Sequence, residues 1–264
     1  MQPHKIVYYD DPLNDDFAGN DINKKPLPKN FKYVHKNPFY WFGSLLVYWL
    51  IAKPILWLVG KIGYGIRIQG KKNLRKIRHE GAFYYGNHTQ IADGWLVQCY
   101  LSGCKRSYII ADRDAMSIKG IRTLVQMIGC LPVPESPEEH ERFVDAIRYH
   151  IAKRHGIVIY PEAHIWPYST RIRPFTDASF VYPSELGAPV VPFCVTYRKR
   201  KFRPNKSPRM TVHVGRPIYP DMSLSLPERK KKLRDAVYDF MLDRATEDEN
   251  EEWISYLPRK KEKQ

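Results

Sequence analysis

Short apolar runs that alternate with longer helical stretches are the feature that most constrains the fold of this chain. Such alternation is typical of α/β proteins, in which helices cover the faces of a sheet. The runs predict strands at Gly65–Ile68, Ala82–Tyr85, Ser107–Ala111, Leu131–Val133, Ile157–Tyr160, Val190–Thr196 and Met210–Val214. Between and after them we expect helices at Trp95–Leu101, Ile121–Ile128, Glu138–Lys153, Asp177–Leu186 and Pro227–Ala245. The pattern predicts an α/β fold with a central mixed β-sheet flanked by helices.

An apolar segment from Phe39 to Gly60 precedes these elements, and its length approaches a bilayer span of about 20 residues. Lys53-Pro54 interrupts it; a charge at mid-depth is costly, and proline removes a backbone hydrogen bond. Its tryptophans and tyrosines favour the boundary between water and lipid. We therefore predict a membrane-associated helical hairpin: two short helices that meet near Pro54 in one leaflet, with Lys53 reaching the headgroups. A hairpin packed on the domain and a single span remain the alternatives.

The chain of 264 residues can bury one sizeable core, so we expect one main domain at residues 63–246. Residues 1–36 are polar and lack the pattern of a secretory signal, residues 37–62 form the membrane-associated anchor, and residues 247–264 are expected to be a loose charged tail. Four cysteines without metal-ligand spacing are expected to be buried and reduced.

Lysine and arginine exceed aspartate and glutamate by 15, which gives an isoelectric point near 9.6. Such a balance suits nucleic acid, an anionic lipid surface or an acidic protein. The positive charge is dispersed and no nucleic-acid-binding motif is present, so no nucleic acid partner is expected. Membrane lipids are the expected partners.

The stretch Gly86-Asn87-His88-Thr89-Gln90-Ile91-Ala92-Asp93-Gly94 carries the clearest chemistry. A carboxylate that accepts a hydrogen bond from one histidine nitrogen fixes the tautomer and leaves the other nitrogen free to take a proton. Residues five apart do not share a helix face, so His88 and Asp93 can meet only if the chain turns between them. The loop follows a predicted strand and precedes a predicted helix, which is a usual setting for a site in an α/β protein. A structural histidine beside a helix cap is the alternative.

Three further segments follow in order: Ile128–Pro134, Ile159–His164 and Ala188–Phe193. Together with the Asn87–Asp93 loop, they make residues 66 to 217 similar to the lysophosphatidate acyltransferase (PlsC-like) family of glycerolipid acyltransferases. That family's blocks are Asn-His-x-x-x-x-Asp, Gly-x-x-(Phe/Val)-(Ile/Val), Phe-Pro-Glu-Gly and Val-Pro-(Val/Ile). The resemblance implies the glycerolipid acyltransferase fold and an enzyme that transfers a fatty acyl group to a lipid hydroxyl.

The resemblance also implies roles for individual residues. His88 would be the general base, and Asp93 would orient it. Pro161 and Glu162 would lie at the same sheet edge, with Glu162 positioning the acceptor. From the residues alone, His164 beside Glu162 could help to hold the acceptor or could have a structural role. We expect the oxyanion donors to be backbone amides near Gly129 or at a helix start. The co-substrate would be an acyl thioester of coenzyme A or acyl carrier protein. No metal, nucleotide or redox cofactor is expected. The enzyme would work at the cytoplasmic face of the cell membrane.

Two family arginines that bind the acceptor phosphate have no counterpart here. Pro134 stands at the end of the second block, and Ala163-His164-Ile165-Trp166 replaces the glycine, threonine and arginine after the third. Substitute cations would be Arg113, Lys119, Arg122, Arg171 and Arg173, of which Arg171 and Arg173 are the best placed. We rank 1-acyl-sn-glycerol-3-phosphate first as the acceptor in phospholipid biosynthesis. A lipid acceptor without phosphate, a lipid-binding protein without activity and a thioester hydrolase are the alternatives.

Overall fold

The computed structural model describes residues 4–19, 26–28, 30–117, 122–247 and 250–259. A seven-stranded sheet in the order β2-β8-β7-β3-β6-β4-β5 forms its centre. The strands are β2 Arg67–Gln69, β3 Ala82–Tyr85, β4 Ser107–Ala111, β5 Cys130–Pro132, β6 Gly156–Ile159, β7 Val190–Arg198 and β8 Arg209–Val214. All neighbours are parallel except β7 and β8. The predicted mixed sheet is confirmed, and each of the seven predicted strands is present.

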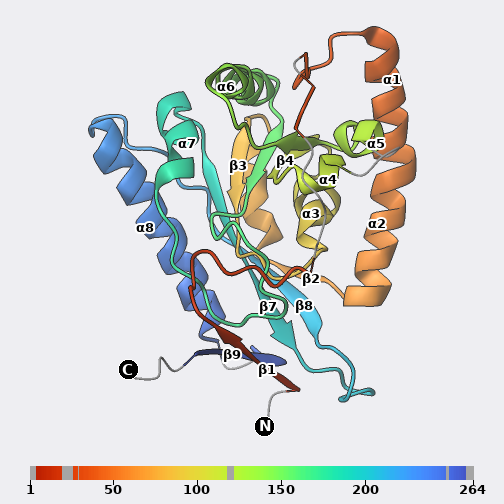
Figure 1. Ribbon diagram of the computed structural model, residues 1–264, viewed down its shortest axis with the longest axis vertical. Helices are drawn as coiled ribbons and strands as arrows, with labels where there is room; N and C mark the ends of the chain where they lie inside the picture. The colour runs from red at the N-terminus through yellow and green to blue at the C-terminus, as the bar shows by residue number, and fades with distance from the viewer. Residues whose placement is uncertain (1–3, 20–25, 29, 118–121, 248–249, 260–264) are drawn as a thin grey trace.

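Helices cover both faces of this sheet (Figure 1). One face carries α6 Pro137–Ala152, α7 Val181–Leu186 with its 3-10 turn Ala178–Phe180, and α8 Leu226–Ala245; the other carries α3 Asp93–Leu96, continued by the π-helix η4 Val97–Leu101. η3 Lys71–Ile77 adds Leu74 and Ile77 to this second face. Met116 of α4 Asp114–Ser117 and Val125 of α5 Arg122–Met127 pack in the core of the first face. Side chains of β3 alternate between the two cores, with Phe83 and Tyr85 in one and Ala82 and Tyr84 in the other. The helix predicted from Ile121 is present as α5, and Ile121 itself lies outside the described residues.

The apolar segment forms one continuous helix of 27 residues, Pro38–Tyr64, in place of the predicted hairpin. It comprises α1 Pro38–Leu46, the π-helical η1 Val47–Ala52, α2 Lys53–Val59 and the π-helical η2 Gly60–Tyr64. Proline removes only one backbone donor, and π-helical winding of the preceding residues is a local adjustment by which a helix continues through that position. Lys53 Nζ donates to the carbonyl oxygen of Gly103 at 2.7 Å, so it points to the domain, whereas the prediction had it reaching lipid headgroups.

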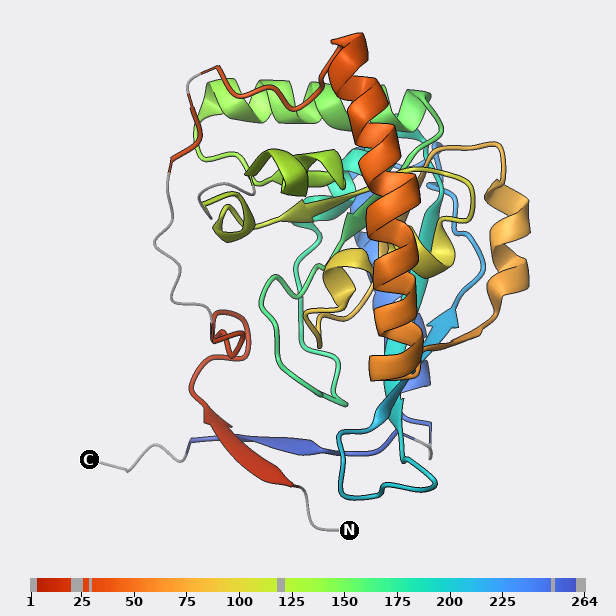
Figure 2. The same cartoon turned by 90° about the vertical axis from the view of Figure 1, so that its right-hand side faces the viewer.

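This helix packs lengthwise on the domain, in front of the layer that contains α3 (Figure 2). Ser44 Oγ donates to the carbonyl of Met127 at 3.0 Å, and the phenol oxygen of Tyr48 accepts the Ser107 N–H at 3.2 Å. Its outer face is apolar and exposed; the large exposed apolar side chains along the whole helix are Phe39, Trp41, Phe42, Leu46, Leu50, Ile51, Ile55, Trp57, Leu58, Val59 and Ile62. By length and composition alone the helix could cross a membrane.

Both ends of the chain contribute ordered structure that the sequence did not predict. β1 Lys5–Tyr9 pairs in parallel with β9 Ile254–Pro258, so part of the expected loose tail is a strand. Leu27, Phe31 and Tyr33 from the polar N-terminal segment are buried in the core that contains Phe143 of α6. Among the cysteines expected to be buried, Cys130 and Cys194 are, Cys99 is half-buried and Cys104 is exposed.

Candidate active site

Parallel pairing of β3 with β6 brings two of the motif loops together. Tyr85 at the end of β3 lies beside Ile159 at the end of β6, so the chain leaves both strands at the same edge of the sheet. Asn87 ties the first loop to β7, because its side chain donates to the carbonyl of Val195 at 3.0 Å and accepts the Val195 N–H at 2.7 Å. The backbone just before His88 is therefore held by two strands, β3 and β7.

The chain turns between His88 and Asp93, as their spacing requires. His88 Nδ1 lies 3.0 Å from Asp93 Oδ2, and Asp93 is fully buried as the first residue of α3. The same oxygen accepts the backbone N–H groups of Thr89 at 2.7 Å and Gln90 at 2.9 Å, so three donors converge on it when Nδ1 carries the proton. The His88 side chain is only 16% exposed. This arrangement fixes the ring orientation and directs Nε2 away from the carboxylate.

Tyr160 contacts both His88 and Asp93, a role that was not predicted from the sequence. Its ring stacks on the His88 imidazole with centroids 4.4 Å apart, and its hydroxyl donates to the backbone carbonyl of Asp93 at 2.7 Å. Burial raises the pKa of Tyr160 well above the ordinary value, so the phenol stays a neutral donor. The signal was present in the chain, because Tyr160 directly follows β6 and precedes Pro161 of the third motif.

Glu162 and Arg173 form a buried ion pair beside His88. Arg173 Nη2 lies 3.3 Å from Glu162 Oε2, and neither side chain is more than 3% exposed. Glu162 also accepts two backbone N–H groups, that of His88 at 3.1 Å and that of Arg173 at 3.0 Å. Burial raises the pKa of the Glu162 carboxyl, and the Arg173 guanidinium and the two N–H donors oppose that rise. The Glu162 carboxylate thus fixes the His88 backbone, and both of its oxygens are bonded to groups of the protein.

The loop between Glu162 and Arg173 doubles back on itself. Ala163 adopts the left-handed conformation with φ 63°, at the position where the family motif has glycine. The carbonyl of His164 accepts a hydrogen bond from Arg173 Nη2, and the Arg173 guanidinium lies over the Trp166 ring, 4.9 Å from its centroid. His164 Nδ1 lies 3.7 Å from a carboxylate oxygen of Asp16. The reversal brings Arg173 back to Glu162, which spacing alone did not reveal.

The predicted phosphate-binding cations occupy different environments. Arg113 is buried, with its guanidinium paired to Glu135 and Glu139, and Arg173 is buried against Glu162. Contrary to the prediction, neither is available to bind the phosphate of an acceptor. Arg122 Nε donates to the carbonyl of Met116. Arg171 is exposed in the loop after the third motif and forms no ion pair within the part of the chain that the structure describes. Lys119 lies outside the described residues.

Gly129 does not belong to this site, contrary to the prediction. It precedes β5, and its carbonyl accepts the N–H of Ile109 in β4, so it lies at the opposite edge of the sheet from His88. Gly129 has φ 103° and approaches the Ser107 carbonyl so closely that a Cβ would lie 2.6 Å from its oxygen. This contact explains the glycine by packing. The helix-start amides proposed as oxyanion donors are also occupied: Asp93, Gly94 and Trp95 donate to carbonyls of the preceding turn.

Comparison with known proteins shows the family and supports the fold. The acyltransferase family model matches residues 65–196, which contain His88, Asp93 and Glu162. The chain belongs to the acyltransferase family. The fold is similar to that of the 1-acyl-sn-glycerophosphate (LPA) acyltransferase PlsC from Thermotoga maritima, with a TM-score of 0.54 and 16% identity over 79% of this chain and 95% of that one. No curated protein matches the chain. The PlsC-like resemblance is confirmed for family and fold.

Proposed function

We propose that this protein transfers a fatty acyl group from an acyl thioester to a hydroxyl of a lysophospholipid-type acceptor. The observation that carries the proposal is the contact of His88 Nδ1 with Asp93 Oδ2 at 3.0 Å, on a carboxylate already held by two backbone N–H groups. The donor would be acyl-coenzyme A or acyl carrier protein, and the chain's own groups supply the acid–base chemistry.

In the proposed reaction, His88 Nε2 removes the proton of the acceptor hydroxyl while that oxygen attacks the thioester carbonyl carbon. The resulting imidazolium carries a proton on Nδ1 that Asp93 accepts as a hydrogen bond, which stabilises the charged form. When the tetrahedral intermediate collapses, the carbon–sulfur bond breaks and His88 returns its proton to the leaving thiolate. A positioned general base typically contributes about 10² to 10⁴ in rate.

A matched set of variants tests the role of His88. His88→Ala is expected to abolish transfer, and Asp93→Asn to lower kcat by at least about 10², because asparagine cannot stabilise the imidazolium. His164→Ala is the control, since this second motif histidine lies beside Asp16 and is expected to keep most of the rate. Release of thiol and formation of acylated lipid from a labelled thioester are measured with and without lysolipid. Wild-type turnover by His88→Ala would refute the assignment, and thiol release without acceptor would indicate a hydrolase.

For the acceptor we propose 1-acyl-sn-glycerol-3-phosphate, with Arg171 as the cation that meets its phosphate. Arg171 is exposed and unpaired among the described residues, whereas Arg113 and Arg173 are committed to carboxylates. Arg171→Gln is expected to raise KM for lysophosphatidate about tenfold and to leave KM for an unphosphorylated lysolipid unchanged. Arg216→Gln, an exposed arginine beyond the end of β8, is the control. Equal effects on both acceptors would exclude a phosphate contact by Arg171.

We also propose that the Pro38–Tyr64 helix lies in one leaflet at the cytoplasmic face of the membrane. Polar contacts from Ser44, Tyr48 and Lys53 to the domain support this orientation, because a helix bonded to the domain over these turns cannot leave it to cross a bilayer. The apolar outer face supplies the surface for insertion. Aspartate at Leu50 and Leu58 of that face is expected to release the protein from vesicles.

A further inference from the structure

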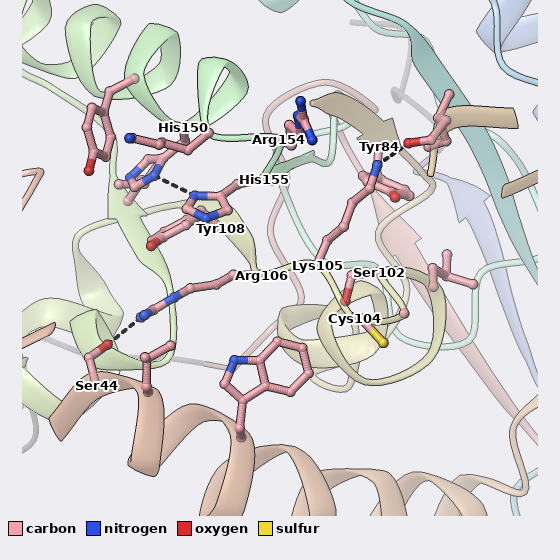
Figure 3. Close-up of a pocket in the computed structure, with 18 of the residues that line it drawn as sticks. Ser44, Tyr84, Ser102, Cys104, Lys105, Arg106, Tyr108, His150, Arg154 and His155 are labelled. Carbon is pink, nitrogen blue, oxygen red and sulfur yellow. Dashed lines mark hydrogen bonds between the residues drawn. The ribbon is translucent and has the colours of Figure 1, made fainter. Parts of the chain in front are cut away.

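A cavity of about 960 Å³ lies at the edge of the sheet where the parallel strands begin, opposite to the strand ends that carry His88. Residues that come before strands line it, with Ile77 ahead of β3. Lys105 and Arg106 come directly ahead of β4, and His155 comes directly ahead of β6 (Figure 3). Because β3, β4 and β6 are parallel, these positions share the edge at which the strands begin, whereas His88 follows the other end of β3. The cavity is therefore separate from the candidate active site.

The charge of this cavity is entirely of one sign. No aspartate or glutamate lines it among the described residues. Its wall contains eight cationic side chains: Lys71, Lys72, Arg75, Arg78, Lys105, Arg106, Lys153 and Arg154. Within the described ranges none of the eight forms an ion pair with a carboxylate. Six of them are exposed at the rim, while Lys105 is half-buried and Arg106 is buried. Such a concentration of unpaired cations in a concave surface attracts an anion.

The inner wall also holds polar atoms without partners. Arg106 is buried, with Nη2 donating to Ser44 Oγ and to the Met127 carbonyl, but its Nε has no hydrogen-bond partner. His150 Nε2 and the hydroxyl of Tyr40 are likewise unpaired in the described part of the chain. Buried polar groups normally find partners, and a buried cation normally finds a counter-charge. A ligand with anionic oxygens would supply both.

An apolar part of the remaining wall comes from the N-terminal helix. Trp41, Leu45 and Trp49 of the Pro38–Tyr64 helix line the cavity, and the outer face of the same helix is the exposed apolar surface described above. The cavity thus joins a cationic rim to an aromatic wall beside the proposed membrane surface. Its volume lies within the range of about 300–1,000 Å³ that is typical of small-molecule sites. A concave site of this size suits one amphiphile better than the broad surface of a protein partner.

We infer that this cavity binds the phosphate headgroup of an anionic phospholipid from the bilayer, with the start of its acyl chains against Trp41 and Trp49. Basic pockets beside membrane helices recognise acidic headgroups by this combination of charge and apolar contact. The inference rests on the proposed membrane association. It adds a lipid site to the protein that is separate from the site of transfer and that holds the opposite edge of the sheet at the membrane.

Binding to the full chain in a neutral detergent tests the inference without turnover. Dioctanoylphosphatidylglycerol is the probe, since it is neither substrate nor product of the proposed reaction; dioctanoylphosphatidylcholine and inorganic phosphate are the comparison ligands. We expect phosphatidylglycerol to bind at least tenfold more tightly than phosphatidylcholine. Arg75→Gln/Arg78→Gln is expected to weaken it about tenfold, whereas the exposed pair Arg203→Gln/Lys206→Gln at the β7–β8 turn changes binding less than twofold.

A second pair of variants tests the same cavity and leaves all eight cationic side chains in place. Cys104 is exposed and lines the cavity, so Cys104→Glu introduces a carboxylate there and is expected to weaken phosphatidylglycerol binding, while Cys104→Gln is not. Equal weakening by the rim and turn pairs would overturn the inference in favour of general charge attraction. Binding of inorganic phosphate as tight as that of the lipid would make the ligand a free anion. Absent lipid binding together with inactive His88→Ala would overturn the headgroup site alone and leave the proposed function standing.

Discussion

Removing the Arg173 guanidinium tests whether this residue supports the site or contacts substrate. Arg173 and Glu162 are both at least 96% buried, and the carboxylate accepts one bond from the guanidinium and two from backbone N–H groups. Arg173→Met keeps an apolar side chain against Trp166 and leaves Glu162 buried without a counter-charge. Breaking a buried pair in this way typically costs about 3–5 kcal/mol. We expect a loss of that size in the free energy of unfolding.

The double variant Glu162→Gln/Arg173→Met separates the charge effect from packing. It removes both charges, so its loss is expected to be smaller than that of Arg173→Met alone, although glutamine can accept from only one of the two N–H groups. For a chain of this length the single variant should lower Tm by roughly 6–20 °C. Arg171→Met, the exposed neighbour, is the control and is expected to stay within about 0.5 kcal/mol of wild type.

Denaturant unfolding followed by tryptophan fluorescence measures these differences in neutral detergent, and kcat and KM are measured on the same preparations. Because Glu162 accepts the His88 N–H, Arg173→Met is also expected to lower kcat. A raised KM for lysophosphatidate at unchanged stability would refute the supporting role and make Arg173 a substrate contact. A double variant less stable than the single one would refute the pairing argument.

Three further outcomes are expected. Ala163→Gly should stabilise the fold by about 0.5–1 kcal/mol in denaturant unfolding, since φ 63° strains alanine; a loss would contradict strain there. Burial lowers the pKa of His150 from 6.5 to about 3, so below about pH 6.5 the unfolded state binds more protons than the folded state. The free energy of unfolding should therefore fall as the pH drops from about 6.5 towards 3, by about 2 kcal/mol at pH 5. An unchanged pH profile of Tm in His150→Gln would contradict this. Leu50→Asp/Leu58→Asp should release the protein from vesicles, unlike Met222→Asp; undiminished sedimentation would contradict the membrane-facing surface.

Most strands of the main sheet were predictable because they are short apolar runs that end in a turn. β1 and β9 were not, because their residues are partly exposed and each strand finds its partner at the other end of the chain. The continuous Pro38–Tyr64 helix was not predicted either, since sequence shows where a proline interrupts the helical bonds but not whether the helix winds around it. Pairing partners and local winding depend on tertiary contacts that composition does not encode.

In the candidate site, His88 and Asp93 were identified as a pair from their spacing, and Glu162 was indicated by the resemblance of the third block to the family's Phe-Pro-Glu-Gly. The role of Arg173 was not predictable, because it depends on the chain reversal that begins at Ala163. Gly129 was assigned to the wrong end of the strands because a sequence motif indicates a strand but does not show which of its two ends lies at the active site. The start of β5 at Cys130 decides that question.

The N-terminal helix connects both edges of the sheet to one proposed membrane surface. Its first half lines the cationic cavity through Trp41 and Trp49. Near its other end, Tyr64 packs edge-on against Trp95, with ring centroids 6.0 Å apart, and Trp95 is only two residues beyond Asp93. Ile91, in the turn between His88 and Asp93, is 70% exposed. A lipid acceptor that enters from the leaflet beside the helix would therefore meet the base without leaving the membrane surface, while the cationic cavity holds the far edge of the domain against the headgroups.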